Sequence, residues 1–187
     1  MHNFITSQLL IFMILHNFTT SHLRFIQAGI MARIVNLEEL EKSLPGEGKG
    51  RIVLTGGCFD ILHLGHVRYL SEAKQMGDYL VVLLESDVKV KELKGGNRPI
   101  FIQAERAEML SALGCVDLVV LLPAMEDDSD YLSLMRTIKP DIIAVTKNDP
   151  HIEKRKDQAK QIGGELRVIP VAGTLSTSQL ARALGVD

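Results

Sequence analysis

Between residues 51 and 171 the chain alternates short apolar runs with longer segments of helical periodicity, which constrains its fold more than any other feature. Most of the apolar runs are dominated by Val, Ile and Leu, as is typical of strands that are buried on both faces. We expect five strands, over residues 51–56, 79–86, 116–122, 141–146 and 165–171. Buried strands separated by amphipathic helices predict an α/β fold, a doubly wound parallel five-stranded sheet with helices on both faces.

The helical segments and the turns between them can be assigned from capping residues and glycines. Helices are expected over residues 37–44, 66–75, 103–113, 130–137 and 151–164, and a last helix begins at Ser176. Gly77 is expected to end the second of these in the left-handed conformation. We expect the Lys-rich segment 87–100 and the acidic segment 126–130 to be loops.

The composition changes at Met31. The first thirty residues contain no Asp, Glu or Lys, whereas charged residues are frequent afterwards. The apolar run 9–15 is shorter than the about 20 residues needed to span a bilayer. A secretory signal is the less favoured alternative, because no Lys or Arg precedes this run. We therefore expect 1–30 to be an extension outside the fold and 31–187 to be a single domain.

Charge and cysteine content exclude some classes of function. The formal net charge is −2 and acids and bases are intermixed, so we expect neither a nucleic-acid-binding face nor an electrostatic membrane anchor. Cys58 and Cys115 have no paired spacing and do not form a disulfide framework, which fits a reducing cytoplasm. Cytoplasmic localisation is the resulting expectation.

The segment "LTGGCFDILHLGH" follows the first predicted strand and carries the chemistry. Gly56 and Gly57 let the backbone approach a bulky anion without an intervening Cβ atom. The helix that begins near Gly65 directs its free N–H groups at the same place. His63 and His66 can both reach that place and donate hydrogen bonds to phosphoryl oxygens. The segment therefore predicts a polyphosphate site at the carboxyl end of a strand, where ligands bind in such sheets.

Other interpretations of the histidines are weaker. A zinc site using His63, His66 and Cys58 would lack an evident fourth ligand and has no familiar ligand spacing. Helix capping alone does not require two histidines beside a Gly-rich turn. A P-loop is excluded because G-x-x-x-x-G-K-[ST] is absent.

With these residues in place, "GCFDILHLGH" resembles the His-x-Gly-His signature of the nucleotidylyltransferase superfamily, and the similarity runs from about Arg51 to the C-terminus. "GDYLVVLLESD" and "GTLSTSQL" resemble bacterial glycerol phosphate cytidylyltransferase. "GHVRYL", "VKELKGGNRPI", "AERAEMLSAL" and "VDLVV" are more similar to the adenylyltransferase half of the bifunctional heptose phosphate kinase/adenylyltransferase. The resemblance implies a Rossmann-like fold.

The resemblance also implies an activity. A nucleoside monophosphate would pass from ATP or CTP to a sugar or polyol phosphate, with release of pyrophosphate and with Mg²⁺ arriving on the nucleotide. The acceptor phosphate would attack the α-phosphorus directly, so catalysis would consist of positioning and charge stabilisation. ATP with a heptose-like 1-phosphate is favoured over CTP with glycerol phosphate. A non-catalytic nucleotide-binding module is the alternative from another class, and a homodimer is suggested.

The resemblance assigns roles to residues by position, and none of them is a metal ligand. The catalytic residues would be His63, His66 and Lys91. The nucleotide would be bound by Gly57, Phe59, Asp60, Gly65, Ser176, Thr177 and Ser178. The acceptor or a phosphate would be bound by Lys94, Arg98 and Arg106.

Several of these residues have ordinary structural explanations. Lys91 and Lys94 lie in a segment where lysines often face solvent. The residues 176–178 would also suit a helix cap. After the fourth predicted strand the chain reads "TKNDPHIEKRKDQ", where the heptose-type enzymes have a Lys-Gly-Gly-Asp-like loop. Asn148 or Asp149 is the candidate to replace the acid of that loop.

Overall fold

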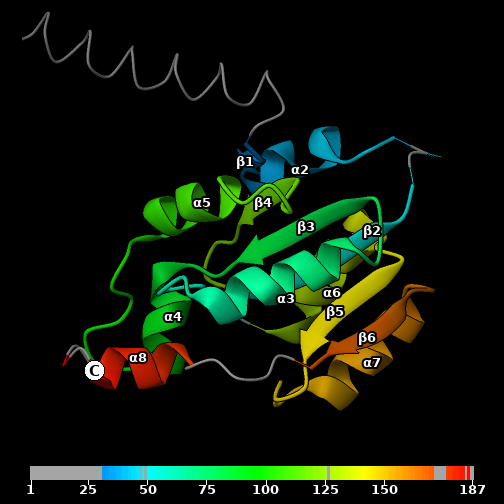
Figure 1. The fold of residues 1–187 in the computed structure, drawn as a ribbon. Helices are drawn as coiled ribbons and strands as arrows, with labels where there is room; N and C mark the ends of the chain where they lie inside the picture. Colours follow the sequence, from blue (N-terminus) through cyan, green and yellow to red (C-terminus); the bar gives the residue numbers. More distant parts are fainter. Residues whose placement is uncertain are drawn as a thin grey trace, which may run out of the picture.

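A computed structural model describes residues 31–46, 48, 50–125, 127–170, 176–183 and 185. Within them, six parallel strands form one sheet in the order β1-β4-β3-β2-β5-β6 (Figure 1). The strands are β1 Arg33–Val35, β2 Ile52–Gly57, β3 Tyr79–Leu84, β4 Leu118–Leu121, β5 Ile142–Thr146 and β6 Glu165–Ile169. The predicted doubly wound α/β architecture is confirmed. The expected extension 1–30 lies outside the described residues.

The expected number of strands was wrong, because the sheet has six strands rather than five. The missed strand, β1, has three residues and pairs with β4 at one edge of the sheet. Only Val35 of the three is buried. A strand this short provides too few apolar positions for a period-two pattern.

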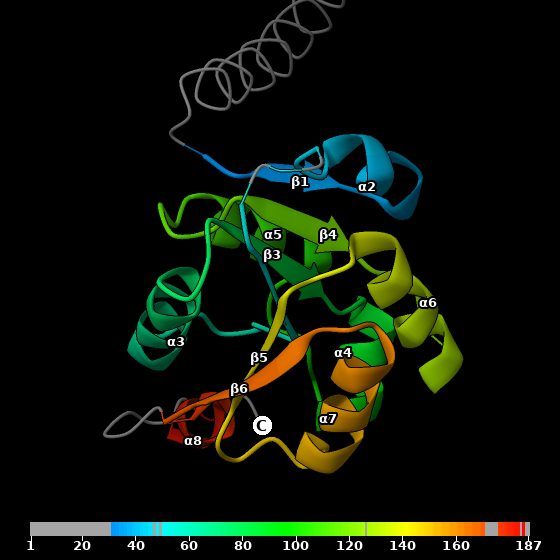
Figure 2. The same cartoon turned by 90° about the vertical axis from the view of Figure 1, so that its right-hand side faces the viewer.

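Helices cover both faces of the sheet, as Figures 1 and 2 show. Successive residues of β3 alternate between two buried clusters, with Leu80 and Val82 in one and Val81 and Leu83 in the other. The first cluster includes α3 (Leu64–Lys74) and α5 (Gln103–Ser111). The second includes α2 (Leu37–Ser43), α6 (Asp128–Ile138) and α7 (Ile152–Gln161). Burial on both faces explains why the strands read as continuous apolar runs.

Two segments expected to be loops are helical. Residues Asp87–Lys94 form α4, and the acidic segment begins α6 at Asp128, while Glu126 lies outside the described residues. The hydroxyl of Ser86 accepts a hydrogen bond from the backbone N–H of Lys89, which is the N-cap arrangement. Asp127 caps α6 in the same manner. Both helices therefore begin at a capped N-terminus within a segment that was expected to be a loop.

The order of the strands reverses at β2. From β2 the chain proceeds outward through β3 and β4, and then returns to place β5 and β6 on the other side of β2. The Gly-rich turn follows β2 at its carboxyl end, where such sheets bind ligands. α8 (Thr177–Ala183) is the last described helix. None of the helices in the described ranges has the length and hydropathy needed to cross a membrane.

Gly77 has a different role from the one expected. Its backbone is not in the left-handed region, so the prediction of a left-handed helix end was wrong. A Cβ atom at this position would lie 2.7 Å from the carbonyl oxygen of Arg51 and 2.7 Å from Cγ2 of Val53. Glycine is required because the turn after α3 passes directly over the start of β2.

We therefore expect Gly77→Ala to lower the free energy of unfolding by about 1–3 kcal/mol, the usual cost of overpacking. Gly114→Ala is the matched control, since nothing lies within 4 Å of a Cβ atom at that position. Denaturant unfolding of both variants measures the difference. Equal stabilities of the two variants would contradict this explanation of Gly77.

Candidate functional site

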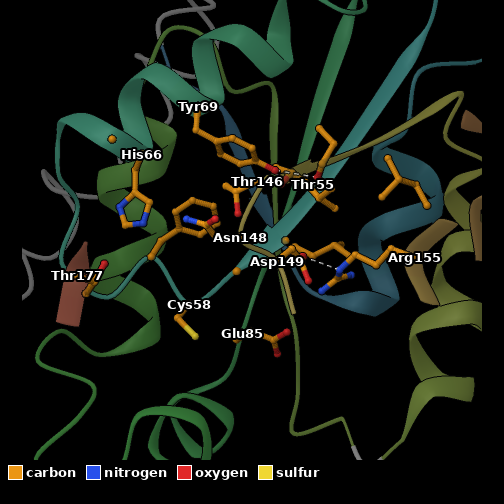
Figure 3. A pocket seen from close by; sticks show the side chains of 18 of the residues that line it. Thr55, Cys58, His66, Tyr69, Glu85, Thr146, Asn148, Asp149, Arg155 and Thr177 are labelled. Carbon is orange, nitrogen blue, oxygen red and sulfur yellow. Dashed lines mark hydrogen bonds and ion pairs between the residues drawn. The ribbon is translucent and has the colours of Figure 1, made fainter. Parts of the chain in front are cut away.

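A pocket of about 450 Å³ opens at the carboxyl ends of β2 and β5 (Figure 3). Its lining includes the Gly-rich turn after β2, the first turn of α3, the loop after β5 and the start of α8. This volume is within the range of small-molecule sites, roughly 300–1,000 Å³. The expected phosphate-binding turn therefore lies in a cavity large enough for a nucleotide or a sugar phosphate.

His63 is the N-cap of α3. Its Nδ1 atom accepts a hydrogen bond of 3.0 Å from the backbone N–H of Gly65. Burial lowers the pKa of His63, which favours the neutral ring. A neutral imidazole that accepts at Nδ1 carries its proton on Nε2. His63 therefore caps the helix with one nitrogen and offers an N–H donor with the other.

His66 lies one turn into α3, with its ring stacked on that of His63 at a centroid distance of 3.9 Å. The edge of Phe59 contacts it from another side, at 5.1 Å. Burial, with a smaller contribution from His63, lowers the pKa of His66 to about 4. Its Nδ1 atom is buried without a hydrogen-bond partner in the described part of the chain. His66 as a residue lines the pocket, although this nitrogen atom is shielded from it.

The lowered pKa can be measured directly. In the ligand-free protein we expect the imidazole of His66 to titrate near pH 4 rather than at its ordinary 6.5. Since the folded state resists protonation, its stability should fall as pH decreases from about 6.5 to about 4. NMR titration of the ring carbon shifts tests this, and a midpoint at or above 6.5 would contradict it.

The turn between β2 and α3 has a strained backbone. Phe59 is buried yet has a φ of 44°, in the left-handed region that non-glycine residues rarely adopt. A Cβ atom on Gly57 would lie 3.2 Å from the Phe59 ring. The position of the Phe59 ring thus leaves little room for a side chain at Gly57, and backbone strain like that at Phe59 concentrates at functional sites.

The structure brings most of the sequence-predicted site residues together. Those that line the pocket are Gly57, Phe59, His63, Gly65, His66, Lys94, Ser176, Thr177 and Ser178. The hydroxyl of Ser176 also accepts a hydrogen bond from the backbone N–H of Gln179, so it caps α8 as well. Lys91, Asp60, Arg98 and Arg106 are not part of the lining.

Asp60 and Arg98 form an ion pair inside the protein. Both side chains are fully buried, and Nε of Arg98 lies 2.5 Å from Oδ2 of Asp60. The other Asp60 oxygen accepts hydrogen bonds from the backbone N–H groups of Ile100 and Phe101. The Arg98–Pro99 peptide bond is cis. This pair holds the segment after α4 against the Gly-rich turn, and it acts on the pocket only indirectly.

Arg106 also has a structural position, because its side chain is fully buried. Its guanidinium donates to the carbonyl oxygens of Cys58, Glu85 and Phe101, and it is paired with Asp87. It joins the Gly-rich turn, the end of β3 and the start of α4. Lys91 is exposed near the end of α4.

Sequence reasoning missed several side chains of the pocket wall, among them Tyr69, Glu85, Tyr131 and Arg155. Tyr69 donates from its hydroxyl to the carbonyl oxygen of Ala144 and so fixes α3 on β5. Glu85 follows β3, and Tyr131 and Arg155 come from α6 and α7. Glu85 could have been found by applying the strand-end rule to β3 as well as to β2. The candidate Asp149 is in the lining and is paired with Arg155 at 3.0 Å.

Among the described residues, no group of three or more His, Cys, Asp or Glu side chains has an arrangement that could hold a metal ion. Cys58 is partly buried in the pocket wall, and burial raises the pKa of its thiol. In the metal-free protein this raised pKa keeps the side chain in the thiol form near pH 7.

Comparison with known proteins gives consistent results. The family model for cytidylyltransferase-like proteins matches residues 54–182. The bifunctional protein HldE of Campylobacter concisus is 50% identical over 116 residues, which cover 62% of this chain and 24% of that protein. HldE of Geobacter metallireducens is 41% identical over 154 residues, 80% of this chain and 30% of that protein. The chain thus spans about a quarter to a third of the length of these curated relatives.

Solved structures agree on the fold. The lipopolysaccharide core biosynthesis protein of Thermoplasma volcanium is similar with a TM-score of 0.55 and 29% identity, over 67% of this chain and 99% of that one. Pantoate-beta-alanine ligase of Francisella tularensis has a TM-score of 0.57 at 16% identity, over 81% of this chain and 77% of that one. At that identity the likeness concerns the fold alone.

Proposed function

Because the chain belongs to the cytidylyltransferase-like family of nucleotidyltransferases, we propose that it transfers a nucleoside monophosphate from ATP or CTP to a sugar or polyol phosphate. Pyrophosphate is the second product. The acceptor phosphate attacks the α-phosphorus, and the bond from that phosphorus to the β-phosphate oxygen breaks. No covalent intermediate with the protein is involved.

The observation that supports this proposal best is the stacked histidine pair at the start of α3, inside the pocket. Both rings have lowered pKa values and are neutral near pH 7. The Nε2–H group of His63 donates to the phosphates, and His66 stabilises the charge that develops as pyrophosphate leaves. Donors that are already oriented stabilise such charge effectively, because they do not reorganise during the reaction.

The remaining phosphate contacts come from two other elements of the pocket. Lys94, at the end of α4, brings a positive charge to the triphosphate. Ser176, Thr177 and Ser178 offer hydroxyl and backbone donors to the β- and γ-phosphates. Lys91, Arg98 and Arg106 have no direct part in this proposal, and Asp60, Arg98 and Arg106 shape the turn instead.

Mg²⁺ enters as part of the nucleotide substrate. It neutralises phosphate charge and retains most of its water ligands. Since the described residues contain no cluster of three metal-binding side chains, phosphate oxygens and water would supply most of the Mg²⁺ ligands.

ATP and a heptose 1-phosphate are the favoured substrates. The proposal rests on the "VKELKGGNRPI" and "AERAEMLSAL" resemblances and on relatives named HldE at 36–51% identity. The name of the Thermoplasma protein, which refers to lipopolysaccharide core biosynthesis, also favours a sugar acceptor. CTP with glycerol phosphate is the alternative pair. Cytoplasmic localisation, a homodimer and the absence of nucleic-acid partners remain part of the proposal.

Measurement of pyrophosphate release tests the proposal and the choice of substrates. ATP and CTP would each be combined with heptose, glycerol, ethanolamine and choline phosphates. We expect a clear maximum for ATP with the heptose 1-phosphate, since a mismatched base leaves polar groups of the site unpaired. A maximum for CTP with glycerol phosphate would transfer the assignment to the alternative pair. Absence of release with every pair would favour a non-catalytic nucleotide-binding module.

A further inference from the structure

Glu85 is a carboxylate in the wall of a pocket whose other features suit anions. It follows the last residue of β3 and is mostly buried. In Figure 3 it lies apart from His66, with Cys58 between them in this view. Burial raises the pKa of Glu85, which shows that its charge is held at a cost in solvation.

The backbone at Glu85 is fixed in position. Its N–H group donates to the carbonyl oxygen of Gly57 at 3.1 Å, and its carbonyl oxygen accepts from Arg106 at 2.8 Å. The backbone of Glu85 is thereby tied to the Gly-rich turn and to Arg106. A group on such a rigid base is preorganised for a ligand.

The side chain of Glu85 retains hydrogen-bonding capacity. The hydroxyl of Tyr131 lies 3.1 Å from both carboxylate oxygens, but it has only one proton to donate. A carboxylate has about four acceptor positions, so most of them remain for a ligand in the pocket. Tyr131 also lines the pocket, and its own oxygen can accept a hydrogen bond from a ligand.

The proposed reaction does not use this carboxylate. An acceptor phosphate is already largely ionised near pH 7, because its second pKa is about 6, so no general base is needed. A carboxylate also repels phosphates and cannot bind them. The ligand groups that complement Glu85 are hydroxyls, which donate hydrogen bonds and carry no charge.

Resting on the proposed function, we propose that Glu85, held by Tyr131, is the subsite that binds neighbouring hydroxyl groups of the acceptor. The acceptor is then a polyhydroxylated sugar phosphate, with its phosphate toward the histidines and its hydroxyls toward Glu85. Choline or ethanolamine phosphate would leave the carboxylate without hydrogen-bond donors from vicinal hydroxyls.

The nucleotide ribose also has neighbouring hydroxyls, but the arrangement of the pocket favours the acceptor. Thr146, the last residue of β5, and Asn148, in the loop after it, offer uncharged polar groups suited to a nucleoside. Glu85 and Tyr131 belong to different elements, the end of β3 and α6. The two substrates must enter from different sides of the α-phosphorus, so Glu85 is assigned to the acceptor.

The test compares equilibrium binding to the wild type and to Glu85→Gln by calorimetry. Heptose 1-phosphate, ATP, 2′-deoxy-ATP and inorganic phosphate are the probes. Glutamine retains the size of the side chain and an acceptor for Tyr131, but loses the charge that strengthens hydrogen bonds from hydroxyls. We expect the Kd for heptose 1-phosphate to rise about 10-fold, the difference typical of charged and neutral hydrogen bonds.

The direction in which each Kd changes distinguishes a hydroxyl-binding subsite from a general effect of the Glu85 charge. If Glu85 acted only through its charge, its removal would tighten the binding of every anionic probe. We expect phosphate and ATP to bind as tightly as before or more tightly, and Glu72→Gln, on the exposed face of α3, to change nothing. Unchanged or tighter binding of heptose 1-phosphate, or no binding of it to the wild type, would overturn the proposal. A loss for ATP that is absent for 2′-deoxy-ATP would assign Glu85 to the ribose and overturn it equally.

These binding measurements do not depend on turnover. If heptose 1-phosphate binding weakens in Glu85→Gln but the wild type releases no pyrophosphate, the proposed hydroxyl subsite is supported and the proposed transfer reaction is refuted. If pyrophosphate is released but heptose 1-phosphate binds equally well to Glu85→Gln, the proposed reaction is supported and the proposed subsite is refuted.

Discussion

Replacement of His66 by alanine is expected to lower turnover by at least about 100-fold, the order of loss seen when an oriented charge-stabilising donor is removed. His66 lies in the first turns of α3 against the ring of His63, and its buried Nδ1 atom has no partner among the described residues. The fold should persist, because the strained turn is also held by Arg106 and by the cap at His63. Steady-state rates of pyrophosphate release measure the effect.

His151→Ala is the matched control for this prediction. His151 is exposed before α7 and is not part of the pocket lining. Its backbone N–H donates to Asp149, and its carbonyl oxygen accepts from the backbone N–H of Arg155. Turnover of this variant should equal that of the wild type. A folded His66→Ala protein with unchanged turnover would refute the role given to the histidine pair.

Asp60→Ala is expected to lower the free energy of unfolding by about 3–5 kcal/mol, because it removes a fully buried carboxylate from its ion pair with Arg98. The exposed fractions of both side chains are 0%, so the pair is shielded from solvent in the wild type. The backbone N–H groups of Ile100 and Phe101 lose their acceptor as well. Urea unfolding measures the loss. Asp60→Asn retains an acceptor, so its free energy of unfolding should lie between those of the wild type and Asp60→Ala.

A surface ion pair provides the comparison. Asp157 and Lys160 lie 3.8 Å apart on α7 with side chains 71% and 69% exposed. Pairs of this kind contribute about 0–1 kcal/mol, so Asp157→Ala should have little effect. If Asp60→Ala were no more destabilising than Asp157→Ala, the buried pair would not hold the turn as we describe.

The sequence was sufficient to predict the parts of the fold that repeat a simple pattern. Buried strands such as β3 show as apolar runs, and the Gly-rich turn with His63 and His66 indicated a phosphate site at a strand end. The three-residue strand β1 was too short to produce a pattern. α4 lies in the Lys-rich segment that was expected to be a loop; it is capped by Ser86, and Val90 is its one buried residue.

The arrangement of charged side chains was harder to predict. Asp60 and Arg98 are 38 residues apart in the sequence, and Arg106 bonds to carbonyl groups on distant segments. Nothing in the local sequence distinguishes an arginine that binds phosphate from one that binds backbone. Likewise, Glu85 and Tyr131 meet only because α6 packs beside the end of β3. Such contacts are set by tertiary structure.

Nucleotidylyl transfer can be observed by ³¹P NMR of ATP and heptose 1-phosphate with the 187-residue protein and Mg²⁺. We expect the signals of both substrates to decrease together, while pyrophosphate and a diphosphate-bridged nucleotide sugar appear in equal amounts. Formation of orthophosphate and ADP without a nucleotide sugar, or persistence of both substrates while CTP and glycerol phosphate also remain unchanged, would contradict it.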